Sequence, residues 1–282
     1  MFSYRHGFHA GNHADVLKHV VLVQLLAHMT AKEKPFTFVD THAGSGAYSL
    51  ETGSYAAQTA EFAGGVARLW GRADLPGAAG DYLRQVAAFN PDGRLLRYPG
   101  SPQIALQMMR PQDRLRLFEL HPTDARALRD YFHADARRVA VGREDGFTCL
   151  KSVLPPPSRR ALVLVDPSYE DKDDYARVAA MMREALVRFP TGVYAVWYPQ
   201  VRRRESSRLP EQLQRLAGER WLHASLTVCA PPADGLGLFG SGMFVFNPPW
   251  PLDARLRGAM PALKAILGRD GAAAFAIQGR QP

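Results

Sequence analysis

Cysteine and long hydrophobic runs are both scarce in this sequence. Its 282 residues include two cysteines, Cys149 and Cys229, which lie far apart and form no CxxC pair. This excludes a disulfide framework and a cysteine-based zinc ribbon, and it favours a reducing compartment. No apolar run approaches the ~20 residues of a membrane span, and the first residues lack the apolar region of a signal peptide. We expect a cytoplasmic protein without membrane contact.

Acidic residues are also in the minority. The chain has 27 Asp and Glu against 35 Lys and Arg, a formal net charge of +8. Such an excess favours a polyanionic partner, since phosphate contacts supply most non-specific affinity for nucleic acid. With 46% hydrophobic residues the chain can form a sizeable core, which excludes general disorder. The length predicts one large domain or one domain with an insertion.

Four short apolar runs of strand character alternate with segments of helical character. Each run leads into an acidic residue: residues 36–39 precede Asp40, 114–118 precede Glu119, 138–141 precede Asp145, and 161–165 precede Asp166. The alternation predicts a doubly wound α/β fold whose parallel strands end at one edge of the sheet. Three further runs, at 192–197, 222–229 and 242–246, would complete a mostly parallel, Rossmann-like sheet of seven strands with an antiparallel last strand.

A helix is expected ahead of the first strand. Apolar residues recur at helical spacing over residues 13–29, which predicts an amphipathic helix. Asn12 is suited to be its N-cap.

One interval is too long for this pattern. Between Gly46 and Glu119 the chain far exceeds the ~20 residues of a simple βα unit, and no convincing strand lies in between. We therefore assign residues 1–49 and 99–282 to the main domain, and 50–98 to a small helical insertion subdomain. Its arginines either contact a polyanion or are solvated on helix surfaces.

A glycine turn follows the first strand, in the pattern Asp40-x-x-x-Gly44-x-Gly46. Glycines at this place let the backbone approach a ligand at the carboxyl edge of the sheet. Ser49 occupies the position of the third glycine in the dinucleotide pattern, so NAD is disfavoured. Glu119, after the second strand, suits a ribose diol, because a carboxylate accepts two hydrogen bonds. Asp145 and Gly146, after the third, suit an adenine amino group.

The fourth strand ends in Asp166-Pro167-Ser168-Tyr169. This motif resembles the D/N-P-P-Y/F/W signature of S-adenosylmethionine-dependent methyltransferases that act on exocyclic amino groups. There, a carboxylate and the carbonyl of the proline would each accept one N–H of the amine and direct its lone pair at the methyl group. Tyr169 would offer a face on which a flipped base can stack. Ser168 replaces the second proline of the signature, and a purely structural strand-to-turn role is the alternative.

Asn247-Pro248-Pro249-Trp250 also matches the written signature. Its strand comes last and is expected to be antiparallel, which would put its end at the opposite edge of the sheet. We therefore interpret it as structural.

Histidines are concentrated in the N-terminal half, where six of the nine occur. Zinc binding is the obvious interpretation, but no cysteine pair is nearby and Asp15 is the one close carboxylate. We therefore expect no metal. His19 and His42 could instead contact the carboxylate of a cofactor.

The opening block, Tyr4-Arg5-His6-x-Phe8-His9-Ala10-Gly11-Asn12-x-Ala14-Asp15-Val16-x-Lys18-His19, is highly specific. With Asp40-Thr41-His42-Ala43-Gly44 it resembles the start of the bacterial 23S ribosomal RNA adenine-N6 methyltransferase J family. The similarity continues through Tyr98-Pro99-Gly100-Ser101-Pro102, Phe118-Glu119-Leu120-His121-Pro122, Glu144-Asp145-Gly146, Trp197-Tyr198-Pro199 and Gly240-Ser241-Gly242-Met243.

The resemblance implies a monomeric class I methyltransferase fold that modifies one adenine of 23S rRNA, either naked or in an early ribosomal particle. By position, it implies an S-adenosylmethionine site formed by His19, His42, Ser101, Glu119, Asp145, Gly146 and Asp166. It also implies that Asp166 is catalytic and that Tyr4, with Pro167 and Tyr169 of the motif, contacts the RNA substrate. The residues alone indicate Ser101 only as the N-cap of a helix that starts at Pro102.

Two alternatives stay open at this point. A DNA adenine-N6 methyltransferase would carry the same four-residue motif, which does not distinguish RNA from DNA. A non-catalytic RNA-binding module could keep the same fold.

Overall fold

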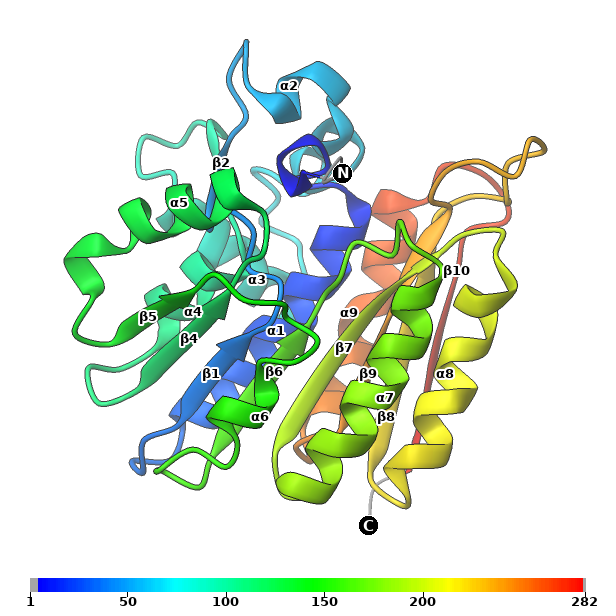
Figure 1. The fold of residues 1–282 in the computed structure, drawn as a ribbon. Coiled ribbons are helices and arrows are strands. Elements are labelled where there is room, and N and C mark those ends of the chain that lie inside the picture. The colour runs from blue at the N-terminus through cyan, green and yellow to red at the C-terminus, as the bar shows by residue number, and fades with distance from the viewer. Residues whose placement is uncertain (1–4, 281–282) are drawn as a thin grey trace.

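The computed structural model describes residues 5–280 and contains one large sheet with helices on both faces (Figure 1). Eight strands form this sheet in the order β10-β8-β9-β7-β6-β1-β4-β5. Their bounds are β1 Thr37–Asp40, β4 Arg114–Phe118, β5 Val139–Gly142, β6 Ala161–Val165, β7 Val193–Gln200, β8 Trp221–Thr227, β9 Gly240–Phe246 and β10 Ala274–Arg280.

Five neighbouring strands, β5, β4, β1, β6 and β7, are mutually parallel. β9 is antiparallel to both β7 and β8, and β10 is antiparallel to β8. The expected mostly parallel α/β sheet is therefore confirmed, and so is the antiparallel pairing of the last two predicted strands. The predicted number of seven strands was wrong, because β10 was missed. β10 is an edge strand with mostly exposed or half-buried residues, so it lacks the apolar run by which the other strands were found.

Helices cover both faces of the sheet. In Figure 1, α6, α7 and α8 lie in front of the strands, and α1, α3, α4 and α9 lie behind them. The helix bounds are α1 His13–Thr30, α2 Tyr55–Thr59, α3 Gly77–Ala88, α4 Ser101–Met108, α5 Pro122–Tyr131, α6 Leu150–Val153, α7 Asp173–Arg188, α8 Arg204–Ala217 and α9 Leu252–Leu267. Short 3₁₀ turns occur at η1 His6–Phe8, η2 Glu61–Gly64, η3 Val66–Arg68 and η4 His133–Asp135.

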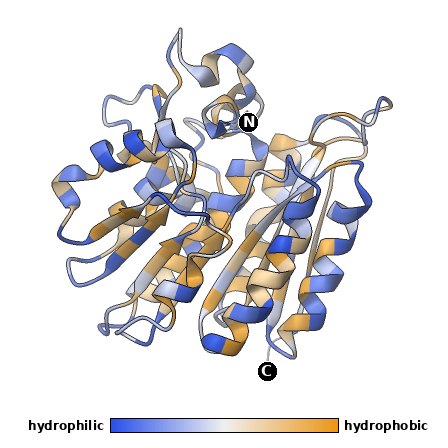
Figure 2. Cartoon of the chain, in the orientation of Figure 1, coloured by the Kyte–Doolittle hydropathy of each residue, from blue (hydrophilic) through white to orange (hydrophobic). Residues whose placement is uncertain are grey.

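The sheet separates two hydrophobic cores. Side chains alternate along β6, so that Leu162 and Leu164 pack with α1, α4 and α9, while Val163 and Val165 pack with α7 and α8. Figure 2 shows hydrophobic residues concentrated in the strands and hydrophilic ones on the outer sides of the helices. This double burial fixes the sheet as a rigid base, with the loops at its carboxyl edge free to carry the site.

α1 begins as predicted. The side chain of Asn12 accepts hydrogen bonds from the backbone N–H groups of Ala14 and Asp15, at 2.9 and 3.0 Å. The predicted amphipathic character was wrong, because α1 is buried almost all round, between the sheet and the helices α3, α4 and α9. No helix within residues 5–280 has both the length and the apolar content needed to cross a membrane.

The inserted segment is helical and joins the main core. β2 (Ala47–Ser49), just before the segment, pairs antiparallel with β3 (Arg97–Pro99) at its end, and the sequence did not indicate either strand. Within the segment, α3 packs on α1 and α9 and buries Tyr82 and Val86. The division of the chain into a main domain and an insertion subdomain stays a prediction.

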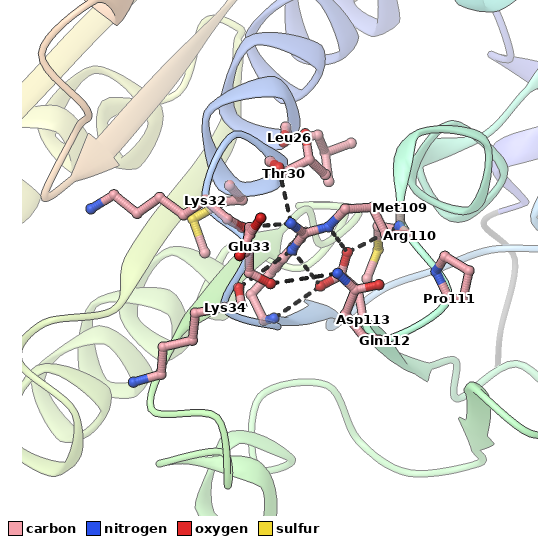
Figure 3. Close-up of polar contacts among 12 residues, drawn as sticks. Leu26, Thr30, Lys32, Glu33, Lys34, Met109, Arg110, Pro111, Gln112 and Asp113 are labelled. Carbon is pink, nitrogen blue, oxygen red and sulfur yellow. Dashed lines mark hydrogen bonds and ion pairs between the residues drawn. The ribbon is translucent and has the colours of Figure 1, made fainter.

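A cluster of polar residues lies at the edge of the sheet opposite the carboxyl ends of the parallel strands, where α1 ends and β1 begins (Figure 3). The Arg110 guanidinium donates to both carboxylate oxygens of Asp113, at 2.9 and 3.0 Å. It also donates to the carbonyls of Thr30 and Lys32 at the end of α1. Asp113 is fully buried and accepts the backbone N–H of Phe36 at 3.1 Å. Arg110 and Asp113 therefore tie α1, β1 and β4 together.

Candidate active site

A pocket of about 360 Å³ lies at the carboxyl edge of the sheet, where β1, β4, β5 and β6 end. Each of these strands contributes residues from the loop that follows it, as expected for a doubly wound sheet. The residues predicted from the sequence that line the pocket are His42, Glu119, Asp145, Gly146, Asp166 and Pro167.

The glycine turn brings the backbone against Glu119. Gly44 has φ +60°, and a Cβ there would lie 2.2 Å from the Tyr48 hydroxyl, so any other residue would strain the backbone and displace the tyrosine. Glu119 accepts the Gly44 N–H at 2.9 Å and the His121 N–H at 2.7 Å, one on each carboxylate oxygen. Burial nevertheless raises the pKa of Glu119. The result is a fixed carboxylate whose remaining lone pairs can accept further hydrogen bonds.

His42 and Gly146 fit closely against each other. A Cβ on Gly146 would lie 2.0 Å from the Thr41 carbonyl oxygen and 2.9 Å from the His42 ring. The Nδ1 atom of His42 contacts the Thr41 hydroxyl at 2.8 Å. Burial lowers the pKa of His42 to about 3, so its imidazole is neutral at physiological pH. In the pocket, His42 is therefore a neutral group that can hydrogen-bond a ligand.

Both carboxylate oxygens of Asp145 accept hydrogen bonds. One accepts the Phe147 N–H at 3.0 Å, and the other pairs with the Arg177 guanidinium from α7. That guanidinium also lies 3.9 Å from the centre of the Phe147 ring. Arg177 and Phe147 were not predicted from the sequence, since neither belongs to a motif and the chain does not show which side of α7 faces the pocket.

Asp166 forms an ion pair with Lys18, whose Nζ lies 2.5 Å from Oδ2 of the carboxylate. Lys18 also pairs with Asp15 on α1, at 2.7 Å. Burial alone would lower the pKa of Lys18, but these two carboxylates outweigh it, and the pKa is raised. Asp166 is therefore held at the pocket by a charged lysine that is itself buried.

Further contacts connect Asp15 to the pocket wall. Asp15 accepts the Gly11 N–H at 2.8 Å and contacts Nε2 of His6 at 3.0 Å. Burial works against ionisation of Asp15, yet His6 and Lys18 hold its pKa well below the usual range. His6 lines the pocket. Lys18 was not predicted as a site residue, although an Asp–Lys pair three residues apart within an apolar helix is a usable signal in the sequence.

Three predicted residues are buried and are not among the residues that line the pocket. Asp40 is fully buried, burial raises its pKa to about 7, and it accepts the Ser101 hydroxyl at 2.6 Å. Ser101 is the first residue of α4 and Gly100 is the N-cap, so the expectation that Ser101 caps this helix was wrong. His19 is buried and contacts the Tyr98 hydroxyl at 2.7 Å through Nδ1. Asp40 and Ser101 thus connect β1 to the start of α4, and His19 connects α1 to β3.

Tyr169 does not present the expected stacking face. Its ring is buried beside Tyr175 and Trp197, and its hydroxyl donates to the Trp197 carbonyl at 2.7 Å. Its backbone is left-handed, with φ +54°, and its side chain belongs to the hydrophobic core formed with α7 and β7. Tyr4, the predicted RNA contact, lies outside the described residues.

The second match to the signature lies at the other edge of the sheet. Asn247 follows β9, which is antiparallel to β7. Its side chain donates to the carbonyls of Pro190 and Gly192, at 2.8 and 2.7 Å. The structural interpretation of this motif is confirmed, although β9 is not the last strand as we expected, since α9 and β10 follow it.

A family model described as "Ribosomal RNA large subunit methyltransferase D, RlmJ" matches residues 33–276. The chain belongs to this family. It is 46% identical over 267 residues to "Ribosomal RNA large subunit methyltransferase J" of Escherichia coli, covering 95% of this chain and 94% of that protein. It is 42% identical to the protein of the same name from Haemophilus influenzae, over the full length of both.

A crystal structure from Legionella pneumophila matches with a TM-score of 0.88 and 33% sequence identity, covering 96% of this chain and 98% of that one. The resemblance found from the sequence motifs is thus confirmed. The family and the strand order together confirm the class I methyltransferase fold and identify the protein as a methyltransferase.

Proposed function

We propose that this protein transfers the methyl group of S-adenosylmethionine to the N6 amine of a flipped-out adenine in 23S rRNA. The observation that carries the proposal is that Asp166 and Pro167 line the same pocket as Glu119 and Asp145. The first pair is suited to an exocyclic amine, and the second to the ribose and adenine of the cofactor. Both halves of the reaction thereby share one cavity.

The pocket is suited to S-adenosylmethionine on several counts. Its volume of about 360 Å³ is within the range of small-molecule sites. Gly146 keeps a side chain out of the place where His42 and Thr41 come together. Glu119 can accept the two hydroxyl groups of a ribose, and Asp145 an adenine amino group. When bound, the cofactor supplies an electrophilic methyl group.

The residues around Asp166 would orient the target amine. The Asp166 carboxylate accepts one N–H of the amine, and the Pro167 carbonyl accepts the other. Lys18 fixes the position of the carboxylate from behind, so that the acceptor is preorganised. Pro167 has no N–H, and its fixed φ favours a turn that presents its carbonyl. Catalysis would then consist mostly of orientation and electrostatics.

Labelled cofactor tests the proposal directly. The parent protein and Asp166→Ala are incubated with labelled S-adenosylmethionine and with protein-free rRNA or genomic DNA. We expect label in rRNA with the parent, and at least 100-fold less with the variant. Transfer to DNA but not to rRNA would overturn the proposal in favour of a DNA methyltransferase. A calorimetric titration with no cofactor binding would instead favour a non-catalytic RNA-binding module.

Mapping the modified base completes the test. In rRNA from cells that lack this gene, we expect one N6-methyladenine of 23S rRNA to disappear and to return when the gene is restored. Its persistence in the deletion strain would contradict the proposed substrate.

A further inference from the structure

The backbone turn after Asp166 depends on a contact from outside the motif. Pro167 and Ser168 follow Asp166 on the pocket wall, and Tyr169 then adopts a left-handed conformation, with φ +54°. That conformation is unfavourable for a residue with a side chain. Within the turn, the contact from the Glu170 N–H to the Ser168 hydroxyl is a long 3.5 Å. Ser168 also lacks the ring that would restrict φ where the signature has a second proline.

Arg203 holds the backbone of this turn from outside the motif, whereas the Tyr169 hydroxyl holds only its side chain, through the Trp197 carbonyl. Its Nη1 donates to the carbonyl of Tyr169 at 2.9 Å and to that of Glu170 at 3.0 Å. Arg203 is the N-cap residue of α8, and its own N–H bonds the Val201 carbonyl at 2.7 Å. The guanidinium therefore connects the end of β7 to the turn after β6, across adjacent strands of the sheet.

The neighbours of Arg203 do not share this role. Arg202, Arg203 and Arg204 form one exposed basic run in the sequence, where all three look equivalent. Arg202 donates instead to the Ala233 carbonyl, at 3.5 Å. Arg203 thus differs from Arg202 in that its guanidinium holds the turn after β6. It is therefore not simply one of several arginines available to bind phosphate.

We propose that Arg203 is a positioning residue for methyl transfer. It holds the carbonyls of Tyr169 and Glu170 so that the turn presents the Asp166 carboxylate and the Pro167 carbonyl to the target amine. This inference rests on the function proposed above. Arg203 acts through the turn and not on the substrate, so its loss affects the rate of transfer more than the binding of RNA or cofactor.

The test compares Arg203→Ala and Arg203→Lys with Arg204→Ala, which removes the same charge from the adjacent position. For each variant, kcat and KM for rRNA are measured, with the Kd for S-adenosylmethionine from calorimetry. We expect Arg203→Ala to lower kcat by about 10- to 100-fold, since misplacement by ~1 Å costs that much. Arg203→Lys should recover part of kcat, because an ammonium can still donate to one carbonyl. Arg204→Ala should keep kcat within about 2-fold of the parent.

A kcat for Arg203→Ala equal to that of Arg204→Ala would overturn the proposal. So would a rise in KM alone with a shallower salt dependence, which would mark Arg203 as a phosphate contact. Hydrogen exchange provides a readout without RNA. Amides of residues 166–175 should exchange at least 10-fold faster in Arg203→Ala than in the parent or Arg204→Ala. Failure of the parent to methylate rRNA would refute the proposed function, while this exchange result would still decide whether Arg203 holds the turn.

Discussion

Oδ2 of Asp166 pairs with Lys18, and the carboxylate also lines the pocket. In the proposed mechanism, the oxygen that faces the pocket accepts a hydrogen bond from the target amine. If Asp166 only accepts a hydrogen bond from the amine, an amide oxygen can replace it in part. We expect Asp166→Asn to keep at least about 10-fold more activity than Asp166→Ala, which corresponds to ~1.4 kcal/mol of transition-state binding. Single-turnover methyl transfer measures both. Equal loss in the two variants would instead indicate a role for the charge or for proton acceptance.

Gly146 allows a direct test of the cofactor side of the pocket. In Gly146→Ala the new Cβ would lie 2.0 Å from the Thr41 carbonyl oxygen, so the turn or the His42 ring must move. We expect at least a 10-fold weaker Kd for S-adenosylmethionine by calorimetry. The control is Gly258→Ala in α9, where a Cβ meets no atom within 4 Å. Unchanged cofactor affinity in Gly146→Ala would contradict the assignment of this turn to the cofactor.

Among the elements, the junction of α1, β1 and β4 depends on the pair formed by Arg110 and Asp113. In Asp113→Asn, an NH2 group replaces one of the two carboxylate oxygens. An NH2 group cannot accept a hydrogen bond, so one N–H donor of Arg110 or of the Phe36 backbone loses its acceptor. We expect Asp113→Asn to lower the free energy of unfolding by about 2–3 kcal/mol. Denaturant titration measures the change, with the exposed Asp92 mutated to Asn as the control. Cofactor affinity should not change, since the junction lies at the opposite edge of the sheet from the pocket.

The same pair predicts how that difference depends on pH. Burial alone would raise the pKa of Asp113, but hydrogen bonds from Arg110 and Phe36 outweigh it, and the pKa is lowered from 3.8. A carboxylate with a lowered folded-state pKa stabilises the protein fully above its unfolded-state value, and this contribution is lost as the pH falls through the folded-state pKa. The stability difference between parent and Asp113→Asn should thus be constant from pH 5 to 8 and shrink below about pH 4. A difference that grows on acidification would contradict this.

For the molecule as a whole, the distribution of charged residues determines where RNA can bind, and the net charge of +8 alone does not. The Asp, Glu and Arg residues of the pocket wall are nearly all acidic: Glu119, Asp124, Asp145, Asp166, Glu170, Asp171 and Asp174 line it, against the single arginine Arg177 among the described residues. RNA phosphates must therefore be bound outside the pocket, by arginines on the surrounding surface. An acidic wall also favours a neutral base over a phosphate inside it.

This arrangement predicts a steep salt dependence of RNA binding. If about five phosphates are contacted, affinity should fall roughly 100-fold between 50 mM and 200 mM salt, because each contact releases condensed counterions. Filter binding or fluorescence anisotropy with an rRNA fragment measures the slope, and cofactor affinity serves as the control. A flat dependence would contradict a binding mode led by phosphates.

Patterns among neighbouring residues were sufficient to predict the elements whose buried residues follow a continuous or periodic pattern along the chain. The strand runs before Glu119 and Asp166 and the Asn12 cap of α1 were predicted because alternation, apolar runs and capping are properties of adjacent residues. β10 and the short pair β2–β3 were missed because each is stabilised by a partner strand far away in the sequence. The same limit applies to the full burial of α1, which depends on three helices contributed by later parts of the chain.

The fold class, the edge of the sheet that carries the site, and the acidic residues Glu119, Asp145 and Asp166 could be predicted, because strand ends and motifs can be located along the chain. Which side chains reach the pocket could not be predicted without the folded structure. The packing of the elements placed Tyr169 in the core, buried Ser101 and His19 away from the pocket wall, and brought Lys18 and Arg203 to the Asp166 turn. The physical reason is that these contacts join residues from separate elements, and their geometry follows from how helices and strands pack.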